Sequence, residues 1–400
     1  MKAINFFISE FLRKNKDDIL GLLLNKYPQF VYKNLNKLPI GEIPVFTFHD
    51  VNQIKFEEQI LFLAENNYKS LSSSEFYEIM TGKKESVENA IVLTFDDGHH
   101  SLWSFVFPIL KKYDMKAISF LIPDKIKDDN THYPNLENVF LDESAFVDIK
   151  KREKVNPFCT WQEIHKMHKS KTIDFQSHSL HHQSIFINNR IMNFVTPSSS
   201  FSVLSSSLVP VIHKNGLDTY PERIEPGYPL FQWAPAMSGE KRFIENEEFV
   251  NACINFVNNS DEEFFTKNNW RSELYQFTKN AEKSGILFGK YQSKDEQYSD
   301  ILKNLKESKK IIEQRINAEV NQLCYPYFRG SNTSLRASKE AGYITNYWGL
   351  IGKKFINSPG HDPFRIARIE ADYIFTLPGK NRRSLLELLS KKIKNRLFIN

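Results

Sequence analysis

The sequence has few cysteines and no long apolar run, and both shortages narrow the class of protein. Its 400 residues include three cysteines, an odd number placed far apart, at Cys159, Cys253 and Cys324. This pattern argues against a disulfide-stabilised scaffold and fits a reducing compartment. No stretch approaches the roughly 18 uncharged apolar residues of a membrane-spanning helix, so none is expected.

Glycine and proline are also sparse, and neither sign of charge dominates. The 15 glycines and 17 prolines exclude collagen-like and low-complexity chains. A net charge of +5 is too small to indicate a nucleic-acid partner, and none is expected. With 41% apolar and 25% charged residues, the composition is that of an ordinary globular protein.

Five short apolar runs predict buried strands that end at polar or proline-containing segments. Patterns between them predict crossover helices over 102–113, 160–168 and 300–316, which together favour an α/β fold with a parallel sheet. In such sheets the chemistry gathers at the carboxyl ends of the strands. The five predicted strands are 43–48, 90–95, 117–122, 172–175 and 321–325.

The alternating pattern breaks in the middle of the chain. Residues 198–207 are rich in serine, 219–235 carry several prolines and predict irregular structure, and 243–279 predict acidic helix. We interpret 188–317 as an insertion that forms either a lid or substrate-binding element, or a structural embellishment.

Two polar clusters follow predicted strands. Asp96 and Asp97 precede Gly98, which permits a tight turn, so two carboxylates can serve one centre in two roles. His178 and His182 are four residues apart, a spacing that can aim both imidazoles at one ion. Each cluster alone is also compatible with a solvated turn or a structural histidine group. Together they predict a three-ligand catalytic metal site with open positions.

The motifs Thr94-Phe95-Asp96-Asp97-Gly98 and His178-Ser179-Leu180-His181-His182 resemble those of the polysaccharide deacetylases, the NodB-homology or family-4 carbohydrate esterase domain. The resemblance implies a distorted (β/α) barrel and a metal-dependent N-deacetylase. It implies that Asp96 is the catalytic base and that Asp97, His178 and His182 bind a divalent metal. Zn²⁺ is the first choice, with cobalt, nickel and manganese left open.

A third motif, Tyr325-Pro326-Tyr327, resembles the family's segment that forms the oxyanion hole, so Tyr327 inherits that role through its backbone N–H. Many members carry an arginine where this chain has Cys324. Arg368 is therefore the candidate substitute that orients Asp96.

The general acid has two candidates. Phe48-His49-Asp50-Val51 resembles a leading motif of the members that act on poly-N-acetylglucosamine, in which the histidine is the acid. Other members use a histidine near the carboxyl terminus, where His361 is the candidate. We prefer His49.

Both ends of the chain are basic. Residues 1–40 predict helix rather than a secretory signal and carry a net +4, and residues 380–400 carry a net +6 around leucines at helical spacing. Such ends can contact an anionic membrane surface or simply pack on the barrel. The chain is expected to be cytoplasmic, with the inner membrane face as a possible location.

These inferences combine into one prediction. The chain is a barrel with a large insertion and helical extensions: 1–40 helical extension, 41–187 first barrel part, 188–317 insertion, 318–376 second barrel part and 377–400 basic amphipathic helix. The predicted activity is metal-dependent hydrolysis of the acetamide of an N-acetylated amino sugar in cell-surface polysaccharide metabolism. The sugar can belong to a polysaccharide, a glycolipid or a lipid-linked precursor. The alternatives are a hydrolase of a non-sugar C–N bond and a non-catalytic carbohydrate-binding protein.

Overall fold

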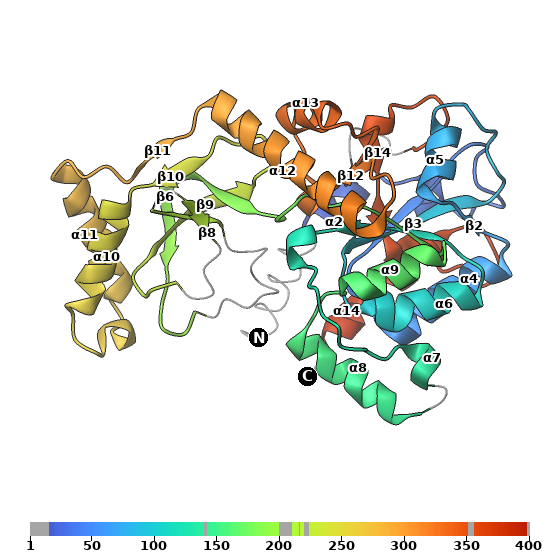
Figure 1. Ribbon diagram of the computed structural model, residues 1–400, viewed down its shortest axis with the longest axis horizontal. Coiled ribbons are helices and arrows are strands. Elements are labelled where there is room, and N and C mark those ends of the chain that lie inside the picture. Colours follow the sequence, from blue (N-terminus) through green and yellow to red (C-terminus); the bar gives the residue numbers. More distant parts are fainter. Residues whose placement is uncertain are drawn as a thin grey trace. The chain divides into compact units, whose positions relative to one another are not determined.

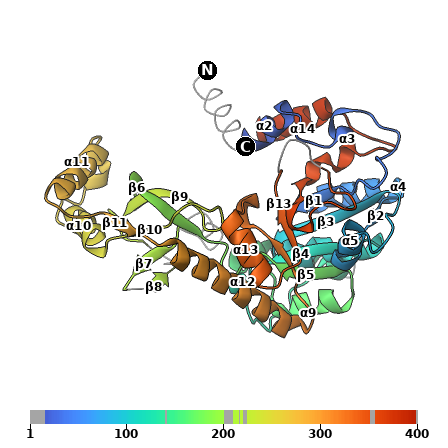
Figure 2. The same cartoon turned by 90° about the horizontal axis from the view of Figure 1, so that it is seen from above.

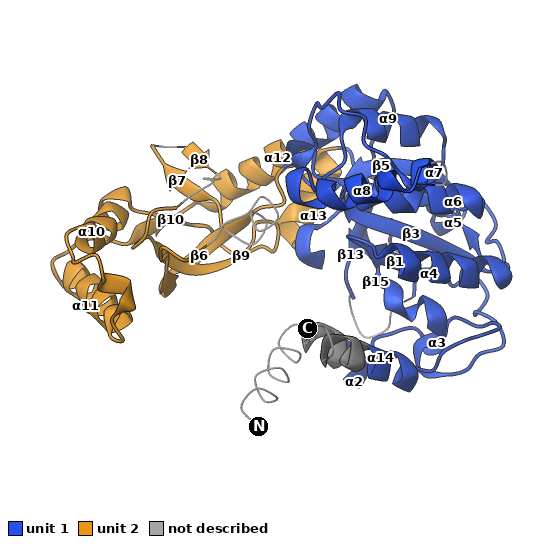
Figure 3. Cartoon of the chain, turned by 90° about the horizontal axis from the view of Figure 1, so that it is seen from below, with its two compact units in different colours: residues 1–180, 307–328, 342–400 blue, residues 181–306, 329–341 orange. Residues whose placement is uncertain are grey.

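The computed structural model describes residues 16–139, 142–199, 210–215, 217–219, 224–350 and 356–397. Its chain divides into two compact units (Figure 3). The first contains residues 1–180, 307–328 and 342–400, and the second contains residues 181–306 and 329–341. The second unit thus overlaps most of the predicted insertion, 188–317. No helix in the described residues is long and apolar enough to cross a membrane.

The first unit is built on a sheet of nine strands, all of whose pairings are parallel. The strand order is β14-β13-β12-β5-β4-β3-β1-β15, with the short β2 added beside β3. Figure 2 shows β1, β3, β4 and β5 side by side. The strands are β1 Val45–Phe48, β2 Lys69–Ser70, β3 Ala90–Asp97, β4 Ala117–Leu121, β5 Ile173–Ser177, β12 Gln322–Cys324, β13 Thr345–Trp348, β14 Ile366–Ala367 and β15 Ile369–Glu370.

The sheet closes on itself through one residue. β14 pairs with β13 at one end of the order and β15 pairs with β1 at the other, yet only Arg368 separates β14 from β15 along the chain. The two ends of the sheet are therefore one interrupted strand, and the sheet forms a nearly closed barrel. The predicted distorted (β/α) barrel is confirmed.

The predicted strands form because they are continuous apolar runs with both faces covered. All four residues of β1 and the first seven of β3 are buried, as expected for strands inside a ring of helices. Helices α4, α6 and α9 lie along the outside, where α9 contacts β5 and α4 contacts α6 (Figure 1). The helices of this unit are α2 Lys16–Leu23, α3 Gln29–Tyr32, α4 Gln53–Glu65, α5 Ser73–Met80, α6 Phe107–Lys112, α7 Leu136–Val139, α8 Ser144–Val155, α9 Trp161–Lys169 and α14 Leu385–Leu397.

Helices occur where the sequence carries start signals. Thr160 and Glu163 form a reciprocal capping box at the start of α9, and Ser72 and Glu75 form another at the start of α5. The predicted helix 102–113 is instead a π-helix, Leu102–Val106, that continues into α6. The predicted helix 300–316 lies within the longer α12 Lys294–Ile316.

The second unit contains small antiparallel sheets and helices around its own phenylalanine-rich core. Phe231 and Phe249 are fully buried in this core. Its elements are β6 Ser184–Phe194, β7 Ile212–Lys214, β8 Leu217–Thr219, β9 Pro229–Pro235, β10 Phe243–Glu245, α10 Glu247–Asn258, α11 Trp270–Lys283, β11 Gly289–Tyr291 and α13 Asn332–Glu340.

The expectation of irregular structure over 219–235 is partly wrong. Residues 229–235 form β9, which pairs with β6. Pro229 and Pro235 stand at its two ends, and the sheet has only two strands, so no central ladder bond is lost. The helix expected over 243–279 begins only at Glu247, after β10, and is divided between α10 and α11. Most of the serine-rich segment 198–207 lies outside the described residues.

Candidate active site

The site lies at the carboxyl end of β3. The sequence prediction placed Asp96 and Asp97 in a loop, but the structure extends β3 through both, pairing them with Phe120 and Leu121 of β4. Successive strand residues normally point to opposite faces. Asp97 has a φ of 70°, which departs from strand geometry and lets both carboxylates approach one histidine.

That histidine is His178, the first residue after β5. Its Nε2 lies 3.5 Å from Asp97 Oδ1 and 3.8 Å from Asp96 Oδ2. Its Nδ1 lies 2.9 Å from the Cys324 carbonyl oxygen. Because a carbonyl can only accept, Nδ1 carries a proton, and Nε2 is the ring nitrogen that faces the carboxylates.

Asp97, His178 and His182 form the predicted metal group. One ligand atom from each side chain lies within 4.8 Å of the others. The donor set of two imidazoles and one carboxylate suits zinc and similar divalent ions. The hydrogen bond from His178 Nδ1 to the Cys324 carbonyl orients the ring so that Nε2 faces the ligand group. Histidines that bind metals commonly make such a hydrogen bond through their other ring nitrogen. The residues present therefore fit a divalent ion.

Asp96 is held by Arg368. The Arg368 Nη1 donates to Asp96 Oδ1 at 2.7 Å, and Nη2 donates to Oδ2 at 2.8 Å. Both side chains are buried, at 2% and 0% exposure. Burial by itself would raise the pKa of Asp96, but the charge of Arg368, aided by His178 and His49, outweighs it and holds that pKa well below its usual range. Asp96 is therefore ionised.

Arg368 occupies the point where the barrel closes. Its guanidinium also donates to Thr94 Oγ1 and lies over the ring of Phe328, 4.9 Å from the centroid. Cys324 places its sulfur 3.8 Å from Asp96 Oδ2. Burial raises the pKa of this thiol well above its usual value, so it stays neutral beside the carboxylate. The arginine missing at position 324 is thus supplied from β14–β15. Thr94 and Phe328 had no predicted role, although Thr94 stands within the first motif.

His49 and His361 lie at different ends of the barrel. His49 follows β1, and its Nε2 is 3.8 Å from Asp96 Oδ2, with the side chain 47% exposed. Next to His361, Gly360 donates its N–H to the Met80 carbonyl, and nearby Asn357 accepts from the N–H of Ile43 before β1 begins. His361 therefore belongs to the amino end of the strands, away from Asp96.

Tyr327 lies in a short 3₁₀ turn, Pro326–Phe328, after β12. Tyr327 and Phe328 both have left-handed backbones, with φ of 55° and 61°. Non-glycine residues in this conformation cost about 1–3 kcal/mol each and concentrate at functional sites. The turn thus presents its backbone at the carboxyl end of the strands, beside the Arg368–Phe328 contact.

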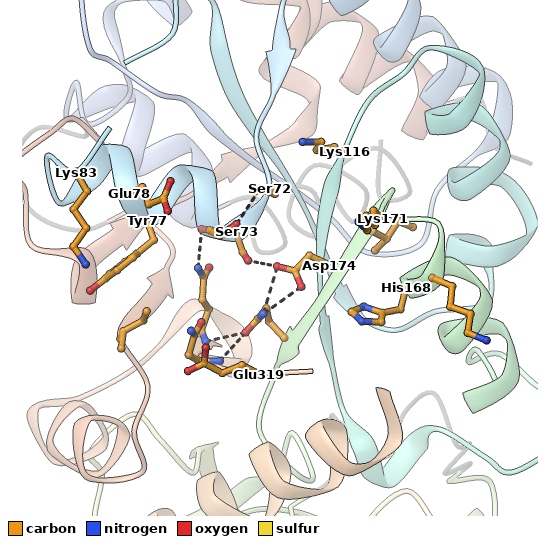
Figure 4. Close-up of a pocket in the computed structure, with 17 residues that line it drawn as sticks. Ser72, Ser73, Tyr77, Glu78, Lys83, Lys116, His168, Lys171, Asp174 and Glu319 are labelled. Atoms are coloured by element: carbon orange, nitrogen blue, oxygen red, sulfur yellow. Dashed lines mark hydrogen bonds between the residues drawn. The ribbon is translucent and has the colours of Figure 1, made fainter. Parts of the chain in front are cut away.

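A cavity lies at the amino end of the strands, at the opposite end of the barrel from Asp96. It has a volume of about 870 Å³ and is lined by Ser73, Lys83, Lys116 and Asp174, among others (Figure 4). Asp174 is near the start of β5, accepts from Ser73, and has a pKa raised by burial. None of the predicted site residues lines this cavity, so it is separate from the carboxylate–histidine group.

Gly98 is required by both conformation and space. Its φ is +74°, and a Cβ there would lie 2.8 Å from Leu121 Cδ2 and 3.1 Å from Ile126 Cδ1. We expect Gly98→Ala to lower the free energy of unfolding by about 1–2 kcal/mol for the left-handed backbone alone, and further for the contact. Urea unfolding measures the change. Gly82→Ala is the matched control, because Gly82 has a φ of +73° with no described atom within 4 Å of its Cβ position. Equal losses would show that Leu121 moves aside at no cost.

Comparisons with known proteins agree with this geometry. Residues 83–200 match the family model described as polysaccharide deacetylase. This segment contains both the Asp96–Asp97 motif and the His178–His182 motif. The resemblance stated from the motifs is thereby confirmed, and with it the enzyme class of the family, hydrolases that act on C–N bonds.

Two curated relatives carry the same name. The poly-beta-1,6-N-acetyl-D-glucosamine N-deacetylase of Escherichia coli (strain K12) is 28% identical over 135 residues, which are 33% of this chain and 18% of that protein. The enzyme of that name from Staphylococcus aureus (strain MRSA252) is 26% identical over 143 residues, covering 36% of this chain and 41% of that protein. The chain thus spans less than half the length of these relatives.

Solved structures of similar proteins include a de-N-acetylase from Aggregatibacter actinomycetemcomitans, with a TM-score of 0.48 and 17% identity over 82% of this chain and 95% of that one. The BpsB deacetylase domain from Bordetella bronchiseptica has the same TM-score and coverages at 14% identity. The barrel assignment rests on the strand order and its closure at Arg368.

Proposed function

We propose that this chain is a metal-dependent N-deacetylase that hydrolyses the acetamide of an N-acetylated amino sugar, with β-1,6-linked N-acetylglucosamine chains as the first substrate to test. The observation that carries the proposal is the arrangement around His178. The ionised, arginine-held carboxylate of Asp96 and the carboxylate of Asp97 both approach His178 Nε2, and His182 completes the ligand group. The named activity of the curated relatives supports this choice of substrate.

A divalent ion held by Asp97, His178 and His182 would polarise the acetamide carbonyl and lower the pKa of a water molecule. Asp96 accepts the proton of the attacking water. Arg368 holds both oxygens of Asp96, which fixes the direction from which a proton is received and keeps the carboxylate ionised beforehand. The backbone N–H of Tyr327 is assigned to the oxyanion that forms from the carbonyl.

His49 is assigned as the acid that protonates the departing amine. Its imidazole lies on the solvent side of Asp96 and also lines a cavity of about 340 Å³ beside β1. A half-exposed imidazole exchanges protons with water, so it can be reprotonated between turnovers. His361 contacts the Ile356 carbonyl at the amino end of the strands, which favours His49 for this role.

The location on an inner membrane surface remains a prediction. In the described part of the basic carboxyl-terminal segment, two cations already contact the chain. Arg382 donates to the carbonyls of Phe30 and Lys33 at the end of α3, and Arg383 lies over the ring of Phe375. These two side chains therefore have structural partners, which favours packing on the barrel for this part of the segment.

The test is release of free amine and acetate from β-1,6-linked N-acetylglucosamine oligomers, with linear β-1,4-linked oligomers and a simple acetamide as comparison substrates. We expect amine release that chelation abolishes and added Zn²⁺ or Co²⁺ restores. Release from the simple acetamide alone would indicate a hydrolase of a non-sugar C–N bond. Saturable oligomer binding with no amine release by the metal-loaded protein would contradict the proposal and indicate a carbohydrate-binding protein.

A further inference from the structure

The first unit contains another group of metal-ligand side chains, formed by Asp50, His99 and His100. One ligand atom from each lies within 4.8 Å of the others. Asp50 comes from the loop after β1, and the two histidines follow β3 immediately after Gly98. The proposed amide hydrolysis uses none of the three, and the sequence analysis did not single them out as ligands. The sequence did contain one indication of this group, which is the pair of adjacent histidines directly after the first motif.

The loops that carry these side chains are fixed by backbone hydrogen bonds. His100 donates its N–H to the Pro157 carbonyl at 2.8 Å, and Cys159 donates to the Gly98 carbonyl at 2.9 Å. Val51 donates its N–H to Ser101 Oγ at 3.3 Å, which joins the Asp50 loop to the histidine loop. The donor atoms are therefore held close together before any ion arrives, which lowers the cost of binding.

Two of these side chains have shifted pKa values. Burial raises the pKa of Asp50, but the hydrogen bond and charge of His99 outweigh it, so the pKa is lowered overall. Burial first, then the charges of His99 and Arg152, lowers the pKa of His100 to about 3.

An ordinary hydrogen bond between Asp50 and His99 accounts for two of the three side chains but not for His100. Asp50 Oδ1 lies 3.1 Å from His99 Nδ1, as in an ordinary aspartate–histidine pair. His100 is a second imidazole, only 3% exposed, whose ring centroid is 4.8 Å from that of His99. Its Nδ1 makes a long contact, 3.4 Å, to Ser104 Oγ in the π-helix. π-helical turns of this kind occur frequently at functional sites.

We propose that Asp50, His99 and His100 bind a second divalent cation, of the zinc type. Two imidazoles and a carboxylate suit Zn²⁺, Co²⁺ or Ni²⁺, whereas Mg²⁺ and Ca²⁺ prefer oxygen ligands. The bound ion would replace the His99 proton and link the loop after β1 to the loop after β3. Because His49 precedes Asp50, this link also fixes the backbone of His49. The proposal does not depend on the deacetylase reaction.

The experiment counts metal ions on the full chain. The protein is stripped with chelator, reconstituted with Zn²⁺, dialysed and analysed by plasma mass spectrometry. We expect two ions per chain in the parent and one each in Asp50→Ala, His99→Gln and Asp97→Ala. His165→Gln, at an exposed histidine on α9 outside both groups, is the matched control and is expected to keep two.

A second measurement covers variants of Asp50 or His99 that fail to fold. Asp97→Ala protein titrated with Co²⁺ should still take up one equivalent, seen as visible absorption, and Zn²⁺ should raise its Tm. A single ion in the parent that is lost in Asp97→Ala and kept in Asp50→Ala would overturn the second site. The reverse pattern would support it and remove the metal from the proposed catalytic group, so the two failures are distinguishable.

Discussion

Replacing Asp96 with asparagine is expected to lower kcat for amine release by about 10²- to 10⁴-fold, the range for loss of a general base, while metal content stays unchanged. Both carboxylate oxygens of Asp96 accept hydrogen bonds from Arg368, and Asp96 lies 3.8 Å from His178 Nε2, so it is placed to accept a proton rather than to bind the ion. Asparagine has nearly the same shape and cannot accept that proton. Steady-state kinetics and metal analysis of the same preparation measure both quantities.

Asp97→Asn is the matched control, because the change is chemically identical one residue away. Asp97 belongs to the ligand group with His178 and His182, so this variant is expected to lose the catalytic ion along with activity. Added metal should restore part of the activity of Asp97→Asn and none of that of Asp96→Asn. If Asp96→Asn loses the ion and Asp97→Asn keeps it, the two roles are reversed.

The barrel could be predicted from sequence because its central strands are continuous apolar runs that end in chemically distinctive residues. The run 90–95 predicts β3, and the residues that follow it are the two carboxylates. The histidines were found because they follow another predicted strand, 172–175, which the structure extends to Ser177. Motifs at strand ends are thus visible to a reader of the sequence, since parallel strands bring their carboxyl ends together.

The closure of the barrel could not be predicted in this way. β14 and β15 have two residues each, too short for any periodic signal, and they are strands only because β13 and β1 pair with them. Arg368 was proposed from the resemblance. Its bidentate contact with Asp96, however, depends on the pairing of β14 with β13 and of β15 with β1. The π-helix Leu102–Val106 was missed for a related reason, because its apolar residues also fit an α-helix.

Arg368→Met is expected to destabilise the protein by about 3–5 kcal/mol, the cost of leaving one member of a buried ion pair uncompensated. Met fills part of the same volume between Phe120 and Phe328 but leaves the Asp96 carboxylate without its cation. Urea unfolding at neutral pH measures the loss. The double variant Asp96→Asn/Arg368→Met carries no buried charge at this pair. We expect it to recover most of the stability that Arg368→Met loses. If the double variant is as unstable as Arg368→Met, the loss comes from packing and not from charge.

The same substitution gives an expected direction for pH dependence. Since the folded pKa of Asp96 is lowered, its contribution to stability is present above the unfolded pKa and is lost as pH falls through the folded pKa. In Arg368→Met the burial effect is no longer outweighed, so the pKa of Asp96 rises and the carboxylate protonates at higher pH. The acid limb of kcat/KM should therefore move to higher pH. Arg368→Lys keeps a positive charge but cannot make the bidentate contact. We expect it to shift the acid limb of kcat/KM less than Arg368→Met does, while still lowering kcat. An unmoved acid limb in both variants would show that Arg368 does not set the ionisation of Asp96.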